Sequence, residues 1–228
     1  MCLKDGTLES LVENHGSISE DLAATAFHHM LKAIDYLAAN DLIHRDLKPA
    51  NILYKSHQGQ YLFQLGDLGF CNHASLSKTL AGTPFYTAPE IYQGGKQTHK
   101  VDVWSLYVTM LWVLNAGGYR VAWQSFRTIE ENREAILRIT SQIGTVENIR
   151  EMGMVDHNER ASAAQMLTKC FAGDGLTSKV RPTIPAMVSD NKPPVTASLS
   201  TTVRSRRDSR RTTNQAMSPL RTVKTRRA

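Results

Sequence analysis

The chain has 228 residues, of which 41% are hydrophobic and 21% charged, which suffices for one folded domain of about 150 residues with further chain beyond it. Residues 1–174 carry 15 basic and 19 acidic side chains, whereas residues 175–228 carry 12 basic and 2 acidic. No apolar run approaches the roughly 20 residues that span a bilayer, and no apolar segment follows a basic start, so we expect no membrane span and a location in the cytoplasm or nucleus.

The first predicted element is a long amphipathic helix over about 19–40, which follows a capping-box pattern formed by Ser17 and Glu20. Short apolar runs at 42–43, 52–54 and 62–65 are separated by polar turns and predict small strands around a loop. From Asp67 to Glu90 the pattern has no periodicity, which predicts a long loop that is either functional or disordered.

The segment 101–115 is almost continuously apolar, so we expect a helix that is buried on nearly every side and forms the core axis of the domain. Helical patterns return over 129–142 and 162–171, and the second ends at the Gly173-Asp174-Gly175 break. Cys2, Cys71 and Cys170 form no Cys-x-x-Cys pair, which argues against a disulfide framework or a zinc site.

Residues 175–228 are rich in Ser, Thr, Pro and Arg and poor in large apolar side chains, so we expect a disordered basic tail. Its arginine clusters at 204–211 and 224–227 suit nuclear import, nucleic acid or an anionic surface. The alternative is a solvated tail, phosphorylated at Ser209 or Thr212.

A set of groups suited to phosphoryl transfer lies in one short string, His44-Arg45-Asp46-Leu47-Lys48-Pro49-Ala50-Asn51. In that chemistry a carboxylate positions the attacking hydroxyl and accepts its proton, a lysine neutralises charge on the transferred group, and an amide oxygen helps hold a metal ion. Asp67-Leu68-Gly69 follows and offers a second carboxylate for Mg²⁺. Two further strings come after it in order, Gly82-Thr83-Pro84-Phe85-Tyr86-Thr87-Ala88-Pro89-Glu90 and Asp102-Val103-Trp104-Ser105-Leu106.

These four ordered motifs resemble those of the eukaryotic protein kinase family, and Lys48 together with Gly82-Thr83 resembles its serine/threonine branch. The resemblance implies a protein-kinase-like large lobe over residues 1–174, mainly α-helical with short β-hairpins around the catalytic loop, followed by the disordered tail 175–228. It implies ATP and Mg²⁺ as cofactors and a protein with a Ser or Thr hydroxyl as substrate.

By the same resemblance, Asp46 is the catalytic base, Lys48 contacts the phosphoryl group, and Asn51 and Asp67 bind Mg²⁺. Thr83 bonds Asp46 and Lys48 and orients the substrate. The implied ATP contacts are the backbone of Met1 and Leu3 against adenine, Leu53 as the adenine floor, the Ala50 carbonyl near ribose, and Lys48, Asn51 and Asp67 at the phosphates.

The resemblance also implies structural roles. His44 packs in the internal spine, Glu90 pairs with Arg160, and Asp102 accepts hydrogen bonds from the backbone near His44 and Arg45. Arg45 beside Asp46 marks the type of kinase whose activation loop is commonly ordered by phosphorylation. The phosphate of the modified loop residue then pairs with that arginine. The candidate phosphosites are Ser75, Ser77 and Thr79, for each of which a plain solvated loop is the alternative.

The sequence departs from the family pattern at its start, where Met1 to Leu8 resembles the hinge between two lobes. No glycine-rich phosphate loop and no strand lysine precede it, so we expect a truncated kinase domain whose apolar upper surface is exposed to a regulatory protein partner. Leu68 replaces the usual phenylalanine and is able to fill its spine position. The alternative function is a catalytically impaired, kinase-like binding or regulatory module, and nucleic-acid binding through the tail is the weakest hypothesis.

Overall fold

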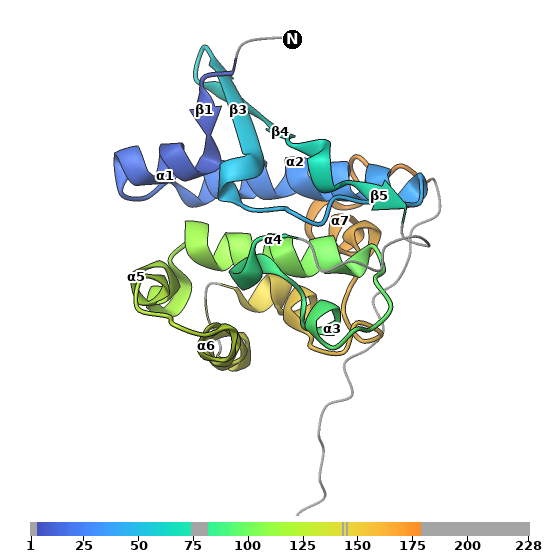
Figure 1. Ribbon diagram of the computed structural model, residues 1–228. Coiled ribbons are helices and arrows are strands. Elements are labelled where there is room, and N and C mark those ends of the chain that lie inside the picture. The colour runs from blue at the N-terminus through green and yellow to red at the C-terminus, as the bar shows by residue number, and fades with distance from the viewer. Residues whose placement is uncertain (1–3, 74–81, 143, 145, 179–228) are drawn as a thin grey trace, which may run out of the picture. The chain divides into compact units, whose positions relative to one another are not determined.

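A computed structural model of the chain describes residues 4–73, 82–142, 144 and 146–178 (Figure 1). In the described part of the chain, no helix is both long and apolar enough to cross a membrane. Several predictions fall outside the described residues: those on Met1, Leu3, Ser75, Ser77 and Thr79, and those on the tail beyond Ser178.

Two long helices form the centre of the fold. Helix α4 (Lys100–Val113) is buried at every residue from Val101 to Val113, because its sequence offers no polar face. Helix α2 (Glu20–Ala39) packs against it (Figure 1). Both predicted helices are confirmed, but the predicted capping box at Ser17 is wrong, since the Ser19 hydroxyl accepts the hydrogen bond from the Leu22 N–H.

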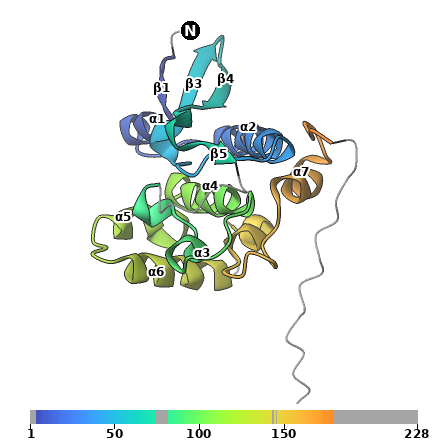
Figure 2. The ribbon, with the colours of Figure 1, turned by 45° about the vertical axis from the view of Figure 1, so that its right-hand side comes forward.

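A three-stranded antiparallel sheet in the order β1-β3-β4 joins Gly6–Thr7, Ile52–His57 and Gln60–Leu65. Gln58 and Gly59 connect β3 to β4 with φ angles of 50° and 78°, the pattern of a two-residue turn that matches the twist of a hairpin. The register pairs Ile52 with Leu65, so the residues just outside the hairpin, 51 and 66, are held together. β4 packs on α2, and the sheet lies on the opposite side of α2 from α4 (Figures 1 and 2).

The prediction of one long loop from Asp67 to Glu90 is wrong in the described residues. β5 (Asn72–His73) pairs antiparallel with β2 (Leu42–Ile43). Short 3-10 helices occupy Leu68–Phe70 and Pro84–Tyr86, and α3 spans Pro89–Tyr92. Elements of two to four residues are too short to produce a hydrophobic period, so the sequence pattern did not reveal them.

The remaining helices surround α2 and α4. α6 (Ile129–Ser141) and α7 (Ala163–Phe171) confirm the two predicted C-terminal helices, and α7 packs on α2 (Figure 2). α5 spans Tyr119–Trp123, and 3-10 helices span Ala116–Gly118 and Glu147–Gly153. Helix α1 (Leu8–His15) was not predicted, because its capping box uses Ser10 at the third position in place of the usual Glu or Gln.

Asp5 ties the start of the described chain to β3. Its carboxylate accepts hydrogen bonds from Lys55 and from the backbone and side chain of Ser56, which together lower its pKa to about 2. Because this pKa is below the ordinary 3.8, the stabilising effect of the tie is present above about pH 4 and is lost as pH falls through 2. We expect an NMR titration to give this value and Lys55→Met to move it back toward 3.8; an unchanged pKa in Lys55→Met would contradict the assignment.

Candidate active site

The loop from His44 to Asn51 is anchored to the core helix α4. The backbone N–H groups of His44 and Arg45 donate to the two carboxylate oxygens of Asp102, at 2.8 and 2.9 Å. Burial raises the pKa of Asp102, and the two N–H donors oppose this rise. The predicted contact is therefore present, and it fixes the loop to the most buried element of the fold.

His44 links the loop to the end of β4. It is fully buried, its Nδ1 accepts from the Asp46 N–H at 3.3 Å, and its Nε2 lies 2.8 Å from the Gly66 carbonyl oxygen. Since a carbonyl only accepts, Nε2 carries the proton and the imidazole is neutral. Both ring nitrogens are thus used in holding the loop in place.

Asp46 is at the centre of a four-residue cluster. Its Oδ1 accepts from the backbone N–H and the hydroxyl of Thr83, at 2.9 and 2.8 Å. Its Oδ2 accepts from Lys48 Nζ and from Asn51 Nδ2, both at 2.9 Å. Lys48 Nζ also donates to the Thr83 hydroxyl at 2.7 Å. Residues separated by up to 37 positions in the sequence are thereby brought together.

The protonation state of Asp46 follows from these contacts. Its side chain is buried, which by itself raises the pKa, but the bonds from Lys48, Thr83 and Asn51 outweigh burial and hold the pKa below its ordinary value. The carboxylate is therefore ionised at neutral pH and is a proton acceptor, not a proton donor.

Asn51 and Asp67 are brought near each other by the β3–β4 hairpin. The Gly66 N–H donates to the Asn51 carbonyl at 2.8 Å, directly before Asp67. Asn51 Nδ2 is committed to the backbone and side chain of Asp46, which leaves its Oδ1 as a ligand oxygen. Asp67 is exposed, with a φ of 54°, and its Oδ1 accepts from the Gly69 N–H.

This donor set fits Mg²⁺. The ion binds hard oxygen ligands, usually through one or two protein groups with water and substrate phosphates completing an octahedron. One amide oxygen and one carboxylate meet that requirement. Among the described residues there is no group of three or more His, Cys, Asp or Glu side chains placed to hold a metal ion, so an all-protein cage is not available there.

The predicted nucleotide contacts are partly within the described structure. Leu53 is in β3, the middle strand of the sheet. Its side chain packs closely against Gly66, because a Cβ added at Gly66 would lie 2.9 Å from Leu53 Cδ1. Ala50 lines a cavity together with Lys48 and Thr83. Leu68 is 60% exposed, so it does not fill an interior spine position here. With Phe70, it forms exposed apolar surface next to Asp67.

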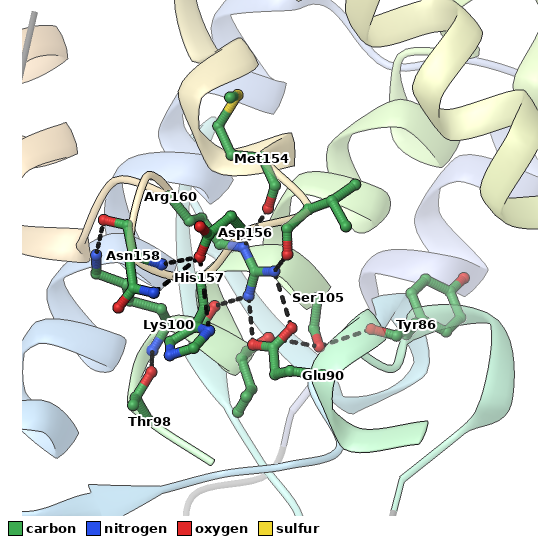
Figure 3. A network of polar contacts seen from close by, with 12 residues as sticks. Tyr86, Glu90, Thr98, Lys100, Ser105, Met154, Asp156, His157, Asn158 and Arg160 are labelled. Atoms are coloured by element: carbon green, nitrogen blue, oxygen red, sulfur yellow. Dashed lines mark hydrogen bonds and ion pairs between the residues drawn. The ribbon is translucent and has the colours of Figure 1, made fainter. Parts of the chain in front are cut away.

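The predicted pair of Glu90 and Arg160 is present and buried. Arg160 Nη1 and Nη2 donate to the two Glu90 carboxylate oxygens at 2.7 and 2.9 Å, with side-chain exposures of 0% and 6%. The same guanidinium donates to the carbonyls of Met154 and Lys100, as Figure 3 shows. It ties α3, at the end of the Gly82–Glu90 segment, to the chain that precedes α7.

Gly82 allows the Thr83 segment to approach the catalytic loop. Its φ is +107°, and a Cβ there would lie 2.4 Å from the Arg45 carbonyl oxygen. We expect Gly82→Ala to displace Thr83 from Asp46 and to lower stability by about 1–3 kcal/mol. Urea unfolding measures the loss, with Gly144→Ala as a matched control, since a Cβ at Gly144 meets nothing within 4 Å. An unchanged stability in Gly82→Ala would contradict this packing.

Two residues near this cluster were not predicted. Glu9 and Glu13 of α1 line the cavity that includes Lys48 and Thr83. Burial raises the pKa of Glu9, the charge of Glu13 raises it further, and the charge of Lys48 opposes this rise. Glu9 and Glu13 were not predicted because no helix was predicted over residues 8–15. Only on a helix do residues four positions apart lie on one face.

The known proteins that this chain resembles are protein kinases. The family model described as a protein kinase domain matches residues 1–191. The ovarian-specific serine/threonine-protein kinase Lok of Drosophila melanogaster is 36% identical over 119 residues, which are 50% of this chain and 25% of the relative. The MAP kinase-activated protein kinase 2 of Drosophila melanogaster is 38% identical over 114 residues, 48% of this chain and 32% of the relative.

A third relative, the calcium/calmodulin-dependent protein kinase type IV of Homo sapiens, is 39% identical over 104 residues, 44% of this chain and 22% of the relative. The chain thus spans a third or less of the length of these curated relatives.

Proposed function

This chain belongs to the serine/threonine branch of the protein kinase family, and on that premise we propose that it transfers the γ-phosphoryl group of ATP to Ser or Thr hydroxyls of a protein substrate. The observation that carries the proposal is the cluster in which Lys48, Asn51 and Thr83 all bond to the ionised carboxylate of Asp46. Positioning and charge stabilisation supply most of the catalysis in this chemistry, and this cluster provides both.

In the proposed mechanism Asp46 acts as the proton acceptor. Each of its oxygens already accepts two hydrogen bonds, so a substrate hydroxyl reaches the carboxylate by replacing one of these donors. The Thr83 hydroxyl is the donor of the same chemical type as the substrate. As the hydroxyl oxygen attacks the γ-phosphorus, its proton passes to Asp46, and the bond from the γ-phosphorus to the oxygen that bridges it to the β-phosphorus breaks, so that ADP leaves. The Lys48 ammonium neutralises charge on the transferred group.

Asn51 Oδ1 and the Asp67 carboxylate are the proposed Mg²⁺ ligands. When bound, Mg²⁺ supplies charge neutralisation across the ATP phosphates. Leu53 and the Ala50 carbonyl are the proposed contacts of the adenosine. Residues 1–174 correspond in this proposal to the large lobe of the kinase domain, which is supported by the helical content and by the order of the motifs along the chain.

A second candidate function is a non-catalytic binding or regulatory module. The exposed apolar side chains of Leu68 and Phe70, next to Asp67, favour it, because such surface adjoining a functional site suits a protein partner. Both functions keep the same fold, so they differ only in nucleotide binding and transfer.

The experiment that separates them is thermal unfolding of the full chain with ATP, with Mg²⁺ and with both. A ligand at about 100 times its dissociation constant stabilises the folded state by about 2.7 kcal/mol. We expect stabilisation that requires ATP and Mg²⁺ together, that is lost in Asp67→Asn, and that remains in the matched control Asp21→Asn, an exposed aspartate of α2. No stabilisation of the parent chain would contradict the kinase proposal and favour the binding module.

A further inference from the structure

Each backbone carbonyl of the 3-10 helix Pro84–Tyr86 accepts a hydrogen bond from a side chain of another helix. The donors belong to α3, α4 and α6 and lie 2.7, 2.8 and 2.9 Å from the carbonyl oxygens. In that order they are Tyr92 to Pro84, Ser105 to Tyr86 and Asn132 to Phe85, and Figure 3 shows the bond from Ser105. Three helices therefore fix one short turn of backbone.

Asn132 is the most distant of these donors in the sequence, 47 positions from Phe85. It is 3% exposed and lies on the buried face of α6, where the other buried residues are apolar. A polar side chain in such a face costs free energy unless its groups are hydrogen-bonded. Both ends of this amide are bonded, because its Oδ1 accepts from the Tyr119 hydroxyl.

The two contacts of Asn132 require a side chain with a donor at one end and an acceptor at the other. The Phe85 carbonyl only accepts, so Nδ2 faces it and Oδ1 faces Tyr119. A carboxylate at this position would place an acceptor against the carbonyl, and an aliphatic side chain would offer it no donor. The amide thus joins the Pro84–Tyr86 turn to the first residue of α5.

The turn held by Asn132 begins at Thr83, whose N–H and hydroxyl both donate to Asp46 Oδ1. In the proposed mechanism the substrate hydroxyl replaces the Thr83 hydroxyl, so the Thr83 N–H is the bond that keeps this segment on the carboxylate. The backbone sets the position of that N–H. Since the Thr83 carbonyl accepts from the Tyr86 N–H at 3.0 Å, the 3-10 bonding couples any shift of the Phe85 peptide to Thr83.

We propose that Asn132 is a positioning residue for phosphoryl transfer, because its bond to the Phe85 carbonyl holds the Thr83 N–H on Asp46 while the acceptor hydroxyl binds. The inference rests on the proposed function for the reaction that is positioned. The contact itself is present in the protein without ATP, so it is open to a test that does not depend on catalysis.

The first test replaces Asn132 with leucine, which is similar in size and forms no hydrogen bond, and measures transfer to a peptide library with a fixed central serine. We expect kcat to fall about ten- to a hundredfold, the effect of misplacing a reacting group by up to about 1 Å. The KM for ATP with Mg²⁺ should not change. The matched control is Tyr119→Phe, which removes the hydroxyl at the far end of the amide, retains the bond to Phe85 and should keep the parent's kcat.

The double variant Asn132→Leu with Tyr119→Phe separates positioning from stability. Asn132→Leu alone leaves the Tyr119 hydroxyl buried without an acceptor, and removal of both groups relieves that cost. The rings of Phe85 and Tyr119 still pack on Trp123, with centroids 5.0 and 5.7 Å from it. The double variant should therefore unfold at a higher temperature than Asn132→Leu and keep its low kcat. A kcat that recovers together with the stability would overturn the inference.

The second test follows amide hydrogen exchange by NMR in the absence of ATP. In both leucine variants we expect the Thr83 N–H to exchange at least about tenfold faster, the effect of weakening one hydrogen bond. The N–H groups of His44 and Arg45, which donate to Asp102, should exchange at the parent's rate. Unchanged exchange at Thr83, or equal acceleration at all three amides, would overturn the inference.

The two tests distinguish failure of this inference from failure of the proposed function. Faster exchange at Thr83 in the variants, with no transfer by the parent chain, would support the role of Asn132 in placing Thr83 and overturn the proposed function. Transfer by the parent with a kcat that Asn132→Leu leaves unchanged would support the proposed function and overturn the inference.

Discussion

Replacing Arg160 with methionine is expected to lower the free energy of unfolding by about 3–5 kcal/mol, because it leaves the Glu90 carboxylate buried without its partner. The pair is bidentate, and the Arg160 side chain is fully buried. Three backbone carbonyls also lose their donor, those of Lys100 and Met154 (Figure 3) and that of Val155. Urea unfolding at pH 7 measures the change.

The control for this prediction is an exposed ion pair. Lys55→Met breaks the contact with Asp5, whose members have side-chain exposures of 48% and 29%, and exposed pairs contribute about 0–1 kcal/mol. The double variant Glu90→Gln with Arg160→Met should be more stable than Arg160→Met alone, because it removes the uncompensated charge. An Arg160→Met chain as stable as the Lys55→Met chain would contradict the structural role given to this pair.

The second large effect is expected at the proposed catalytic base. Asp46→Asn should lower the rate constant of phosphoryl transfer by about 10²–10⁴, the range for removing a general base. Asparagine has the same shape as aspartate, but its side chain has one oxygen that accepts hydrogen bonds where the carboxylate has two. Lys48 and Thr83 therefore lose some of their hydrogen bonds to residue 46 as well. Binding of ATP with Mg²⁺ should persist, because Asp67 and the Asn51 oxygen are unchanged.

This pattern distinguishes chemistry from folding. A fall in kcat with retained stabilisation by ATP and Mg²⁺ identifies a role in the reaction step. Loss of both, together with a lower unfolding temperature, would instead mean that Asp46 mainly holds the loop together. Asp21→Asn again provides an exposed aspartate as the control, and it should change neither quantity.

The sequence predicted the elements whose signal is long or strongly apolar. Helix α4 follows from an apolar run without a polar face, and α2 follows from a period sustained over five turns. The ordered motifs, through the family resemblance, also implied contacts across the chain, such as Glu90 with Arg160 and Thr83 with Asp46. The structure contains both contacts.

The elements that were missed depend on tertiary contacts. The pairing of β2 with β5 involves two residues on each strand, which is too little for any periodic pattern. Helix α1 is eight residues long, below the length at which an isolated helix is stable, so packing of Leu8, Leu11 and Val12 determines it. Its two glutamates could not be assigned to the cavity before that helix was known.

The most direct test of the central claim is transfer of labelled phosphate from ATP to a Ser/Thr peptide by the purified full chain, measured beside its Asp46→Asn variant at equal concentration. The account predicts phosphoserine or phosphothreonine product with the parent, dependent on Mg²⁺, and at least about a hundredfold less with the variant. No transfer by the parent, or equal transfer by Asp46→Asn, would contradict it.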